Sequence, residues 1–513
     1  MPLKGVGKDQ SSRLRYYVAQ THGLWRVSLG TVIQKRRGQT MSIAPVDVWC
    51  IGCVLVLGIL CAFSRFVEAS WLSLVVSVAF FVGVLFLEPS FYIGFLAVAF
   101  AVAANIAGCA MCELMPQYLP ELVCDSYFVG SLPLLAFSRI FMMALLVVYE
   151  THGLKSEREM GDDSPQVRSR RDGDRILLVI NALIALISLS LFMKVVRYPS
   201  FVLGWDRFRY AKEGIISGVW SKAVSWMGFF IIIPLASLSR RGPIRAFSVV
   251  AIASYLLYYF WTGSKFGAFF GVVCLVLMAS YSFLASRANR RPMLLASALL
   301  ASMVLLVGFS VFAKGLISGS DPLESLVQRG SQQGQLWWAT YAVVDGTSHP
   351  QEFQAELDAL DADASISENV GANYGIYKIM YLTAPKTTID NKLSSGSRYT
   401  EGGYPAAYYY FGAWGVIGFS VVMALLMGTI DGFLIKCVRR GWWIEAVLLV
   451  RIHGFAYGAL SMFTFQNFFT RTSILTYVLF FGLALVRWML KKKDNVTRLS
   501  IGSAGAAAPS HSE

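Results

Sequence analysis

The chain has 513 residues, of which 56% are hydrophobic and 15% are charged. Soluble domains carry about 25% charged residues, so this composition excludes a soluble globular protein and indicates an integral membrane protein in a lipid bilayer. The formal net charge of +14 is accompanied by no zinc-finger spacing and no soluble basic domain, which excludes nucleic acid as a partner. Positive charge is instead expected in loops that face the cytoplasm.

Residues 1–43 are polar and carry eight Lys and Arg against one acid, Asp9. This stretch lacks the apolar core of a cleavable signal peptide, so we predict a basic cytoplasmic tail. An alternative interpretation is that translation starts at Met41 and that the preceding residues are upstream sequence.

Twelve apolar runs follow that are long enough to cross a bilayer, which takes about 20 residues. They are 44–63, 70–87, 91–112, 127–149, 176–195, 217–238, 246–261, 268–286, 293–315, 406–430, 443–463 and 472–490. The runs predict an all-α polytopic membrane protein with about twelve transmembrane helices. Nine lie in 44–315 and three in 406–490, with one long loop, 316–405, between helices nine and ten. Residues 491–513 are rich in Ser, Ala and Gly and are expected to be a disordered cytoplasmic tail.

The orientation follows from the positive charge of alternate connections. One set of connections, which includes both termini, contains 28 of the 45 Lys and Arg residues. Because cytoplasmic loops are enriched in these residues, both termini are predicted inside and the long loop outside.

Two outward connections carry cations close to the membrane. The string WDRFRYAKEG holds Arg207 and Arg209, whose guanidinium groups suit a phosphate or diphosphate. The alternative is an interfacial helix in which Arg209 pairs with Glu213. The string TGSKFG places Lys265 between two glycines at the membrane edge, where a lysine also commonly anchors a helix.

The long loop contains two unusual strings. In QRGSQQGQLWW, helical spacing would put Arg329 and Gln333 on one face beside Gln332, a cation next to amides that can bind hydroxyl groups. Trp337 and its neighbour Trp338 suit packing on sugar rings and equally suit anchoring a helix at the interface.

The second string, SGSRYTEGGYP, carries Arg398, Tyr399 and Glu401 before a Gly pair that lets the backbone bend around a ligand. Tyrosines 408–410 follow and are typical of an aromatic belt at the membrane surface. Between the two strings, residues 352–368 have the spacing of a surface amphipathic helix, whose acids we interpret as a solvated face.

Several chemically distinctive side chains fall within or beside the apolar runs. Ionisable groups inside a membrane are functional candidates, and this group comprises Arg139, Lys222, Arg451 and His453. His453 suits either a proton relay or a hydrogen bond between helices, and we favour the hydrogen bond. Cys112 and Cys124 flank a predicted outer loop, where a disulfide between them is one possibility.

Taken together, Arg207 and Arg209, TGSKFG, QRGSQQGQLWW and RYTEGGYPAAYYYFGAWG resemble the O-antigen or exopolysaccharide repeat-unit polymerases (Wzy-like) of bacterial inner membranes. Those proteins are similar in having ten to fourteen helices, large external loops with required arginines, and a Gly-Ser-Arg turn before a helix. The resemblance covers roughly residues 190–440. One departure is Lys265, which stands where an arginine is usual and weakens the case for bidentate phosphate binding there.

The resemblance implies a GT-C-like glycosyltransferase that joins undecaprenyl-diphosphate-linked glycans, donor to acceptor, on the periplasmic face. It implies further partners, a flippase and a chain-length regulator. Cations must stabilise the lipid diphosphate as it leaves, which we expect of Arg207, Arg209, Arg329 and Arg398. Supporting substrate contacts are expected from Lys265, Gln332, Gln333, Trp337 and Tyr399.

A carboxylate such as Glu401, Asp206 or Glu213 is expected to deprotonate the acceptor hydroxyl. No cluster of Asp or Glu lies near the arginines in the sequence, so we expect neither a metal nor another cofactor.

Two other functions remain open. A lipid-linked oligosaccharide flippase or other transporter would share the plan of twelve helices, although transporters usually keep their external loops short. An O-antigen ligase is expected to use a histidine in its long outer loop. Here the loop contains only His349, without the glycine eight residues later that the ligase pattern implies.

Overall fold

The computed structural model describes residues 44–154, 170–203, 210, 213–238, 240, 242–262, 321–344, 346–360, 374–394, 398–399 and 401–505, with scattered positions between 293 and 308. The chain divides into two units, Met1–Pro45 and Val46–Glu513. All contacts described below lie within the second unit.

The described chain is almost entirely helical, as the apolar runs predict. Nine helical stretches are long and apolar enough to cross a membrane among the described residues. They confirm an all-α polytopic membrane protein, because a helix satisfies every backbone polar group internally. The expected run 268–286 lies outside the described residues, as does most of 293–315. The twelfth, 472–490, falls in α22 (Arg471–Gly505).

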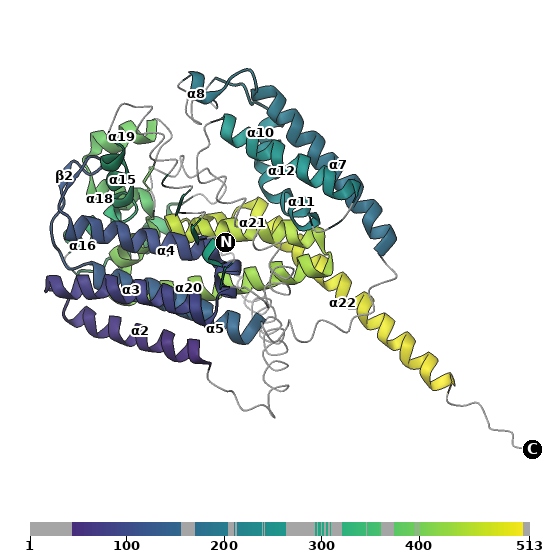
Figure 1. Ribbon diagram of the computed structural model, residues 1–513, viewed down its shortest axis with the longest axis horizontal. Coiled ribbons are helices and arrows are strands. Elements are labelled where there is room, and N and C mark those ends of the chain that lie inside the picture. The colour runs from purple at the N-terminus through teal and green to yellow at the C-terminus, as the bar shows by residue number, and fades with distance from the viewer. Residues whose placement is uncertain are drawn as a thin grey trace, which may run out of the picture. The chain divides into compact units, whose positions relative to one another are not determined.

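The first four spanning helices are α2 (Pro45–Ala62), α3 (Val67–Leu87), α4 (Ser90–Leu114) and α5 (Leu132–Tyr149), which continues into a π-helical turn, Glu150–Leu154. Helices α3, α4 and α5 pack against one another (Figure 1). Their junction is fixed by Glu113, whose carboxylate accepts the backbone N–H groups of Ser131 and Leu132 and the hydroxyl of Ser70. The Glu113 carboxylate thus pairs backbone N–H groups at the start of α5, which have no acceptor within the helix itself.

A second group consists of α7 (Arg170–Val195), the short α8 (Ser200–Leu203), α10 (Val219–Phe230), α11 (Ile232–Ser237) and α12 (Pro243–Trp261). Helices α7 and α12 pack along each other. The shared apolar core of this group takes in Leu434 and Ala446 from the last long helices.

Those last helices are α20 (Gly403–Arg440) and α21 (Trp443–Met462), followed by a 3-10 turn, Phe465–Phe468, and α22. Helix α20 packs on both α5 and α21 (Figure 1). Its backbone departs from helical geometry at Gly412, where φ is +64°. Helix α22 continues to Gly505, past residue 491, where the C-terminal tail was expected to begin. Lys, Arg and Ala there are compatible with a helix.

The long polar segment is folded into short helices. They are α15 (Pro322–Ser331), α16 (Gln335–Val344), α17 (Pro350–Asp358), α18 (Ile376–Thr383) and α19 (Lys386–Ser394). A small antiparallel pair, β1 (Tyr118–Leu119) and β2 (Cys124–Asp125), lies in the connection between α4 and α5. The polar segment packs where α4 and α21 end and where α5 and α20 begin, a region that we call the loop end.

Candidate functional site

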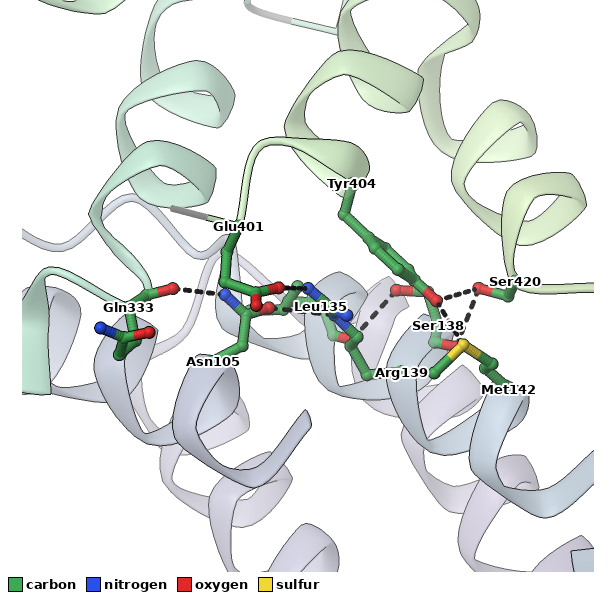
Figure 2. A network of polar contacts seen from close by, with 9 residues as sticks. All are labelled: Asn105, Leu135, Ser138, Arg139, Met142, Gln333, Glu401, Tyr404 and Ser420. Atoms are coloured by element: carbon green, nitrogen blue, oxygen red, sulfur yellow. Dashed lines mark hydrogen bonds and ion pairs between the residues drawn. The ribbon is translucent and has the colours of Figure 1, made fainter. Parts of the chain in front are cut away.

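A completely buried arginine, Arg139, lies at the centre of the loop end. Its Nη2 is 2.7 Å from Oε2 of Glu401, and its Nε donates to Oδ1 of Asn105 at 3.0 Å. The guanidinium carbon lies 3.9 Å from the centre of the Tyr404 ring. Figure 2 shows the carboxylate of Glu401 and the amide of Asn105 converging on this one guanidinium. A carboxylate, an amide and an aromatic face thus hold this buried cation. Its Nη1 has no hydrogen-bond partner among the described residues.

Tyr404 extends this network along α20. Its hydroxyl lies 3.0 Å from Oγ of Ser420, which donates to the backbone oxygen of Ser138 on α5 at 2.9 Å (Figure 2). The same tyrosine hydroxyl lies 3.5 Å from the sulfur of Met142. The network therefore joins α5 to the first half of α20 in a region where unpaired polar groups are costly.

The backbone around Glu401 is constrained on the other side by α21. The N–H of Gly402 donates to the oxygen of Ser461 at 2.7 Å. A Cβ on Gly403 would lie 2.0 Å from the oxygen of Leu460, so only glycine permits this approach. Glu401 itself has φ +60°, a left-handed conformation that is unusual for a residue with a side chain. The two glycines thus serve close packing, where the sequence had suggested room for a ligand.

The QRGSQQGQLWW string docks on α4 through backbone contact. Cβ atoms on Gly108 and Gly334 would lie 2.5 Å and 1.9 Å from backbone atoms across the interface. Nδ2 of Asn105 donates to the backbone oxygen of Gln333 at 2.5 Å (Figure 2). The string spans the end of α15, a turn at residues 332–334 and the start of α16, so Arg329 does not share a continuous helix with Gln333. Arg329 is exposed and donates to Oε1 of Gln332 at 3.0 Å.

The two tryptophans of this string are structural. Trp337 is fully buried, and its indole N–H donates to the oxygen of Ser131 at 3.0 Å. Trp338 is also buried and donates to the oxygen of Tyr127 at 2.8 Å. Neither ring offers an open face for a sugar in this structure, which argues against the expected substrate contact of Trp337. Gln332 and Gln333 remain half-buried.

Glu121, in the connection between α4 and α5, holds the end of the polar segment. Its carboxylate accepts from Nε2 of Gln335 and from Nζ of Lys392, and its backbone oxygen accepts from the hydroxyl of Tyr399. Nζ of Lys392 lies 4.6 Å from the centre of the Tyr399 ring. Burial, with the Glu121 charge nearby, raises the pKa of Tyr399 above its usual range. Tyr399 is thus a buried anchor, whereas the adjacent Arg398 is exposed.

Two acids of α17, Glu352 and Glu356, have partners on other elements, which the interpretation of these acids as mainly a solvated face did not include. Nζ of Lys378 lies 2.9 Å from Glu352 and 3.1 Å from Glu356. The hydroxyls of Tyr409 and Tyr410 donate to Glu352 and Glu356 respectively. Hydrogen bonds from Lys378 and Tyr409 lower the pKa of Glu352. These tyrosines therefore hold α17 on α20, a role that an aromatic belt would not have required.

His349 is the residue that immediately precedes α17. Its ring stacks on Tyr409 with centroids 4.6 Å apart, and Nδ1 lies 3.6 Å from Glu352. Its backbone N–H donates to the oxygens of Tyr409 and Tyr410. This histidine therefore anchors the N-terminal end of α17.

Besides Arg139, two of the intramembrane cations, Arg451 and His453, have partners on other helices. Nδ1 of His453 on α21 lies 2.8 Å from Oδ1 of Asp431 on α20, which is fully buried. This contact agrees with the favoured hydrogen bond between helices. Arg451 lies over Trp226, 5.0 Å from its ring centre. Lys222 is exposed on α10.

Other expected positions divide into those that the structure places and those that it does not. Arg207, Arg209, Lys265 and Asp206 lie outside the described residues. Glu213 is exposed. Both cysteines of the considered disulfide are free, and the sulfur of Cys112 lies 3.7 Å from the oxygen of Ser331.

Comparison with known proteins adds one partial match. Residues 369–478 match a family model described as a family of unknown function (DUF6418). This stretch includes Arg398, Glu401, α20 and α21. No curated protein and no solved structure matches the chain.

Proposed function

We propose that this protein is a membrane glycosyltransferase that joins lipid-diphosphate-linked oligosaccharide repeat units into a surface polysaccharide. The observation that supports this most is the joint docking of both arginine-bearing strings on the loop end. Asn105 and Arg139 connect the turn after Arg329 with the segment after Arg398. Both outer arginines remain exposed, Arg329 in the last turn of α15 and Arg398 in the non-helical stretch before α20, where a lipid-linked headgroup would lie.

In the proposed reaction, an acceptor hydroxyl oxygen forms a bond with the anomeric carbon of the donor glycan. The bond from that carbon to the lipid diphosphate breaks, and the diphosphate leaves with the bonding electron pair. Arg329 and Arg398 would stabilise its growing negative charge, because guanidinium groups pair with phosphate oxygens in a bidentate manner. Arg207, Arg209 and Lys265 remain part of the proposal as further cations.

The hydroxyl proton requires a base. Glu401 was the first expectation, but its carboxylate is buried and paired with Arg139, which opposes proton acceptance from a substrate. Glu213 is exposed and remains a candidate from the same set of expected bases.

The orientation and location complete the proposal. Positive charge in the alternate connections supports both termini in the cytoplasm and the loop end in the periplasm of a bacterial inner membrane. Undecaprenyl-diphosphate-linked glycans would be donor and acceptor, supplied by a flippase and limited by a chain-length regulator.

The test uses purified protein with a lipid-linked repeat unit and gel separation of products. Arg329→Ala and Arg398→Ala should each lower the rate of chain elongation by about 100-fold or more, as loss of one charge-stabilising group does elsewhere. Lys386→Ala is the matched control, since Lys386 is an exposed cation of the same polar segment outside the proposed site. Product ladders like those of the unaltered protein from both arginine variants would refute the proposal.

A transporter is the second candidate, because Asp431 and His453 form a buried polar pair within the membrane helices. Such pairs occur along the pathways of transporters. In cells that lack the protein, single repeat units accumulating on the outer face would support the polymerase, and accumulation on the inner face would support a flippase.

A further inference from the structure

We propose that Arg139 is a positioning residue that sets both outer arginines in place from within the membrane. This inference rests on the proposed function. Glu401 shares this positioning role as the ion-pair partner of Arg139.

The first support is the position of Arg139 between the two strings. Through Nη2 it holds Glu401, three residues after Arg398. Through Nε it holds Asn105, whose amide donates to the oxygen of Gln333, four residues after Arg329. Figure 2 shows the chain of contacts from Gln333 through Asn105 and Arg139 to Glu401. One buried guanidinium therefore connects segments that are far apart in sequence.

The second support is the backbone of Glu401. A left-handed conformation, here φ +60°, is unfavourable for any residue with a Cβ and persists where the surroundings enforce it. Glycine would adopt this backbone without strain. A glutamate at this position is therefore explained by its side chain, whose carboxylate meets Arg139 at 2.7 Å.

The third support is the difference in exposure between neighbours. Arg398 is exposed, whereas Tyr399 is 3% exposed and the Glu401 side chain 10% exposed. The segment is thus fastened by its buried members while its arginine projects. A guanidinium that must meet a diphosphate gains from such a fixed base, because misplacement by about 1 Å can cost about 100-fold in rate.

The experiment measures attachment of the segment separately from activity. Trypsin cleaves after arginine, and the bond after Arg398 is protected while Tyr399 is buried. We expect Arg139→Gln and Glu401→Gly to speed cleavage after Arg398, mapped by mass spectrometry, by about tenfold or more, and to lower the elongation rate by a similar factor. Arg139→Lys, which keeps a cation beside Glu401, should retain most of the protection of the bond after Arg398 and most of the elongation rate.

Two controls separate this role from general damage. Gly454→Ala, where a Cβ would meet nothing within 4 Å, should leave cleavage and rate unchanged. The double variant Arg139→Gln with Glu401→Gln leaves no buried charge without its partner. It should unfold at a detergent melting temperature close to that of the unaltered protein and still show fast cleavage.

The outcomes distinguish this inference from the proposed function. Unchanged cleavage after Arg398 in the double variant would overturn the attachment by Arg139. Faster cleavage with a normal elongation rate would overturn the positioning role. Absence of any glycosyl transfer by the unaltered protein would refute the proposed function, while the cleavage comparison would still test the attachment.

Discussion

Gly334 gives the sharpest test of how the polar segment is held on the membrane helices. A Cβ at this position would lie 1.9 Å from the backbone nitrogen of Cys109, and ordinary contact begins at 3.4 Å. Gly334→Ala therefore requires the turn between α15 and α16 to move away from α4 by about 1.5 Å, the difference between these distances. Backbone atoms on both sides leave no flexible side chain to yield.

The cost follows from what this movement breaks. The bond from Asn105 to the oxygen of Gln333, now 2.5 Å, would lengthen to about 4 Å, beyond hydrogen-bonding range. Loss of that bond costs about 1 kcal/mol, and overpacking adds about 1–3 kcal/mol. We expect Gly334→Ala to lower the free energy of unfolding by about 2–4 kcal/mol.

The measurement is denaturant unfolding of the purified protein in detergent micelles. Gly454→Ala is the matched control, because a Cβ at Gly454 meets nothing within 4 Å and alanine favours the interior of a helix by up to about 1 kcal/mol. Equal unfolding free energies for the two variants would refute the close backbone contact between α4 and the turn.

Two further predictions concern ionisable pairs. Because Lys378 holds the pKa of Glu352 below its ordinary value of 4.5, the stability from this pair is present above that value and is lost as the pH falls through the lowered pKa. Hydrogen exchange of residues 350–358, corrected for intrinsic rates, should accelerate as the pH is lowered from 7 through the lowered pKa of Glu352. Lys378→Met should remove most of that acceleration, and an equal acceleration in the variant would count against the pairing. His453→Leu should lower the free energy of unfolding by about 3–5 kcal/mol, because it leaves Asp431 buried without its partner. The double variant with Asp431→Leu should recover much of that loss. Equal losses in the single and double variants would contradict the pairing.

The spanning helices could be predicted from the sequence because their main requirement is local. A segment in lipid must be apolar and must satisfy its own backbone, so composition over about 20 residues suffices. The helix ends depend on more than composition. Helix α20 was expected over 406–430 but runs from Gly403 to Arg440. It ends only where Gly441 adopts φ +69°, a common way for a helix to stop.

The centre of the candidate site could not be predicted, because its partners are distant in the chain. Arg139 and Glu401 are 262 residues apart, and no spacing rule links them. The sequence did identify each as unusual, Arg139 as a cation within an apolar run and Glu401 as part of the second string. What it lacked was the packing of α5 against α20, which brings the two together.

Trp337 shows a different limit of sequence reasoning. A tryptophan near a membrane surface satisfies the same pattern whether it binds a sugar, anchors a helix or fills a core. The deciding fact is the backbone oxygen of Ser131, which accepts its indole N–H from 206 residues away. The acids of α17 are a similar case, since Lys378 and the tyrosines of α20 belong to other elements.

The contacts at the loop end also constrain the topology. Arg139 lies near the start of α5 and contacts Tyr404 near the start of α20, so both helices begin at the same side of the membrane. Between the end of α5 and the start of α20 the chain must therefore cross the membrane an odd number of times. Among the described residues, α7, α10 with α11, and α12 supply three crossings. The expected twelve-helix arrangement has five crossings between α5 and α20, which is also an odd number. Four crossings would place the start of α5 and the start of α20 on opposite sides of the membrane and would separate Arg139 from Tyr404.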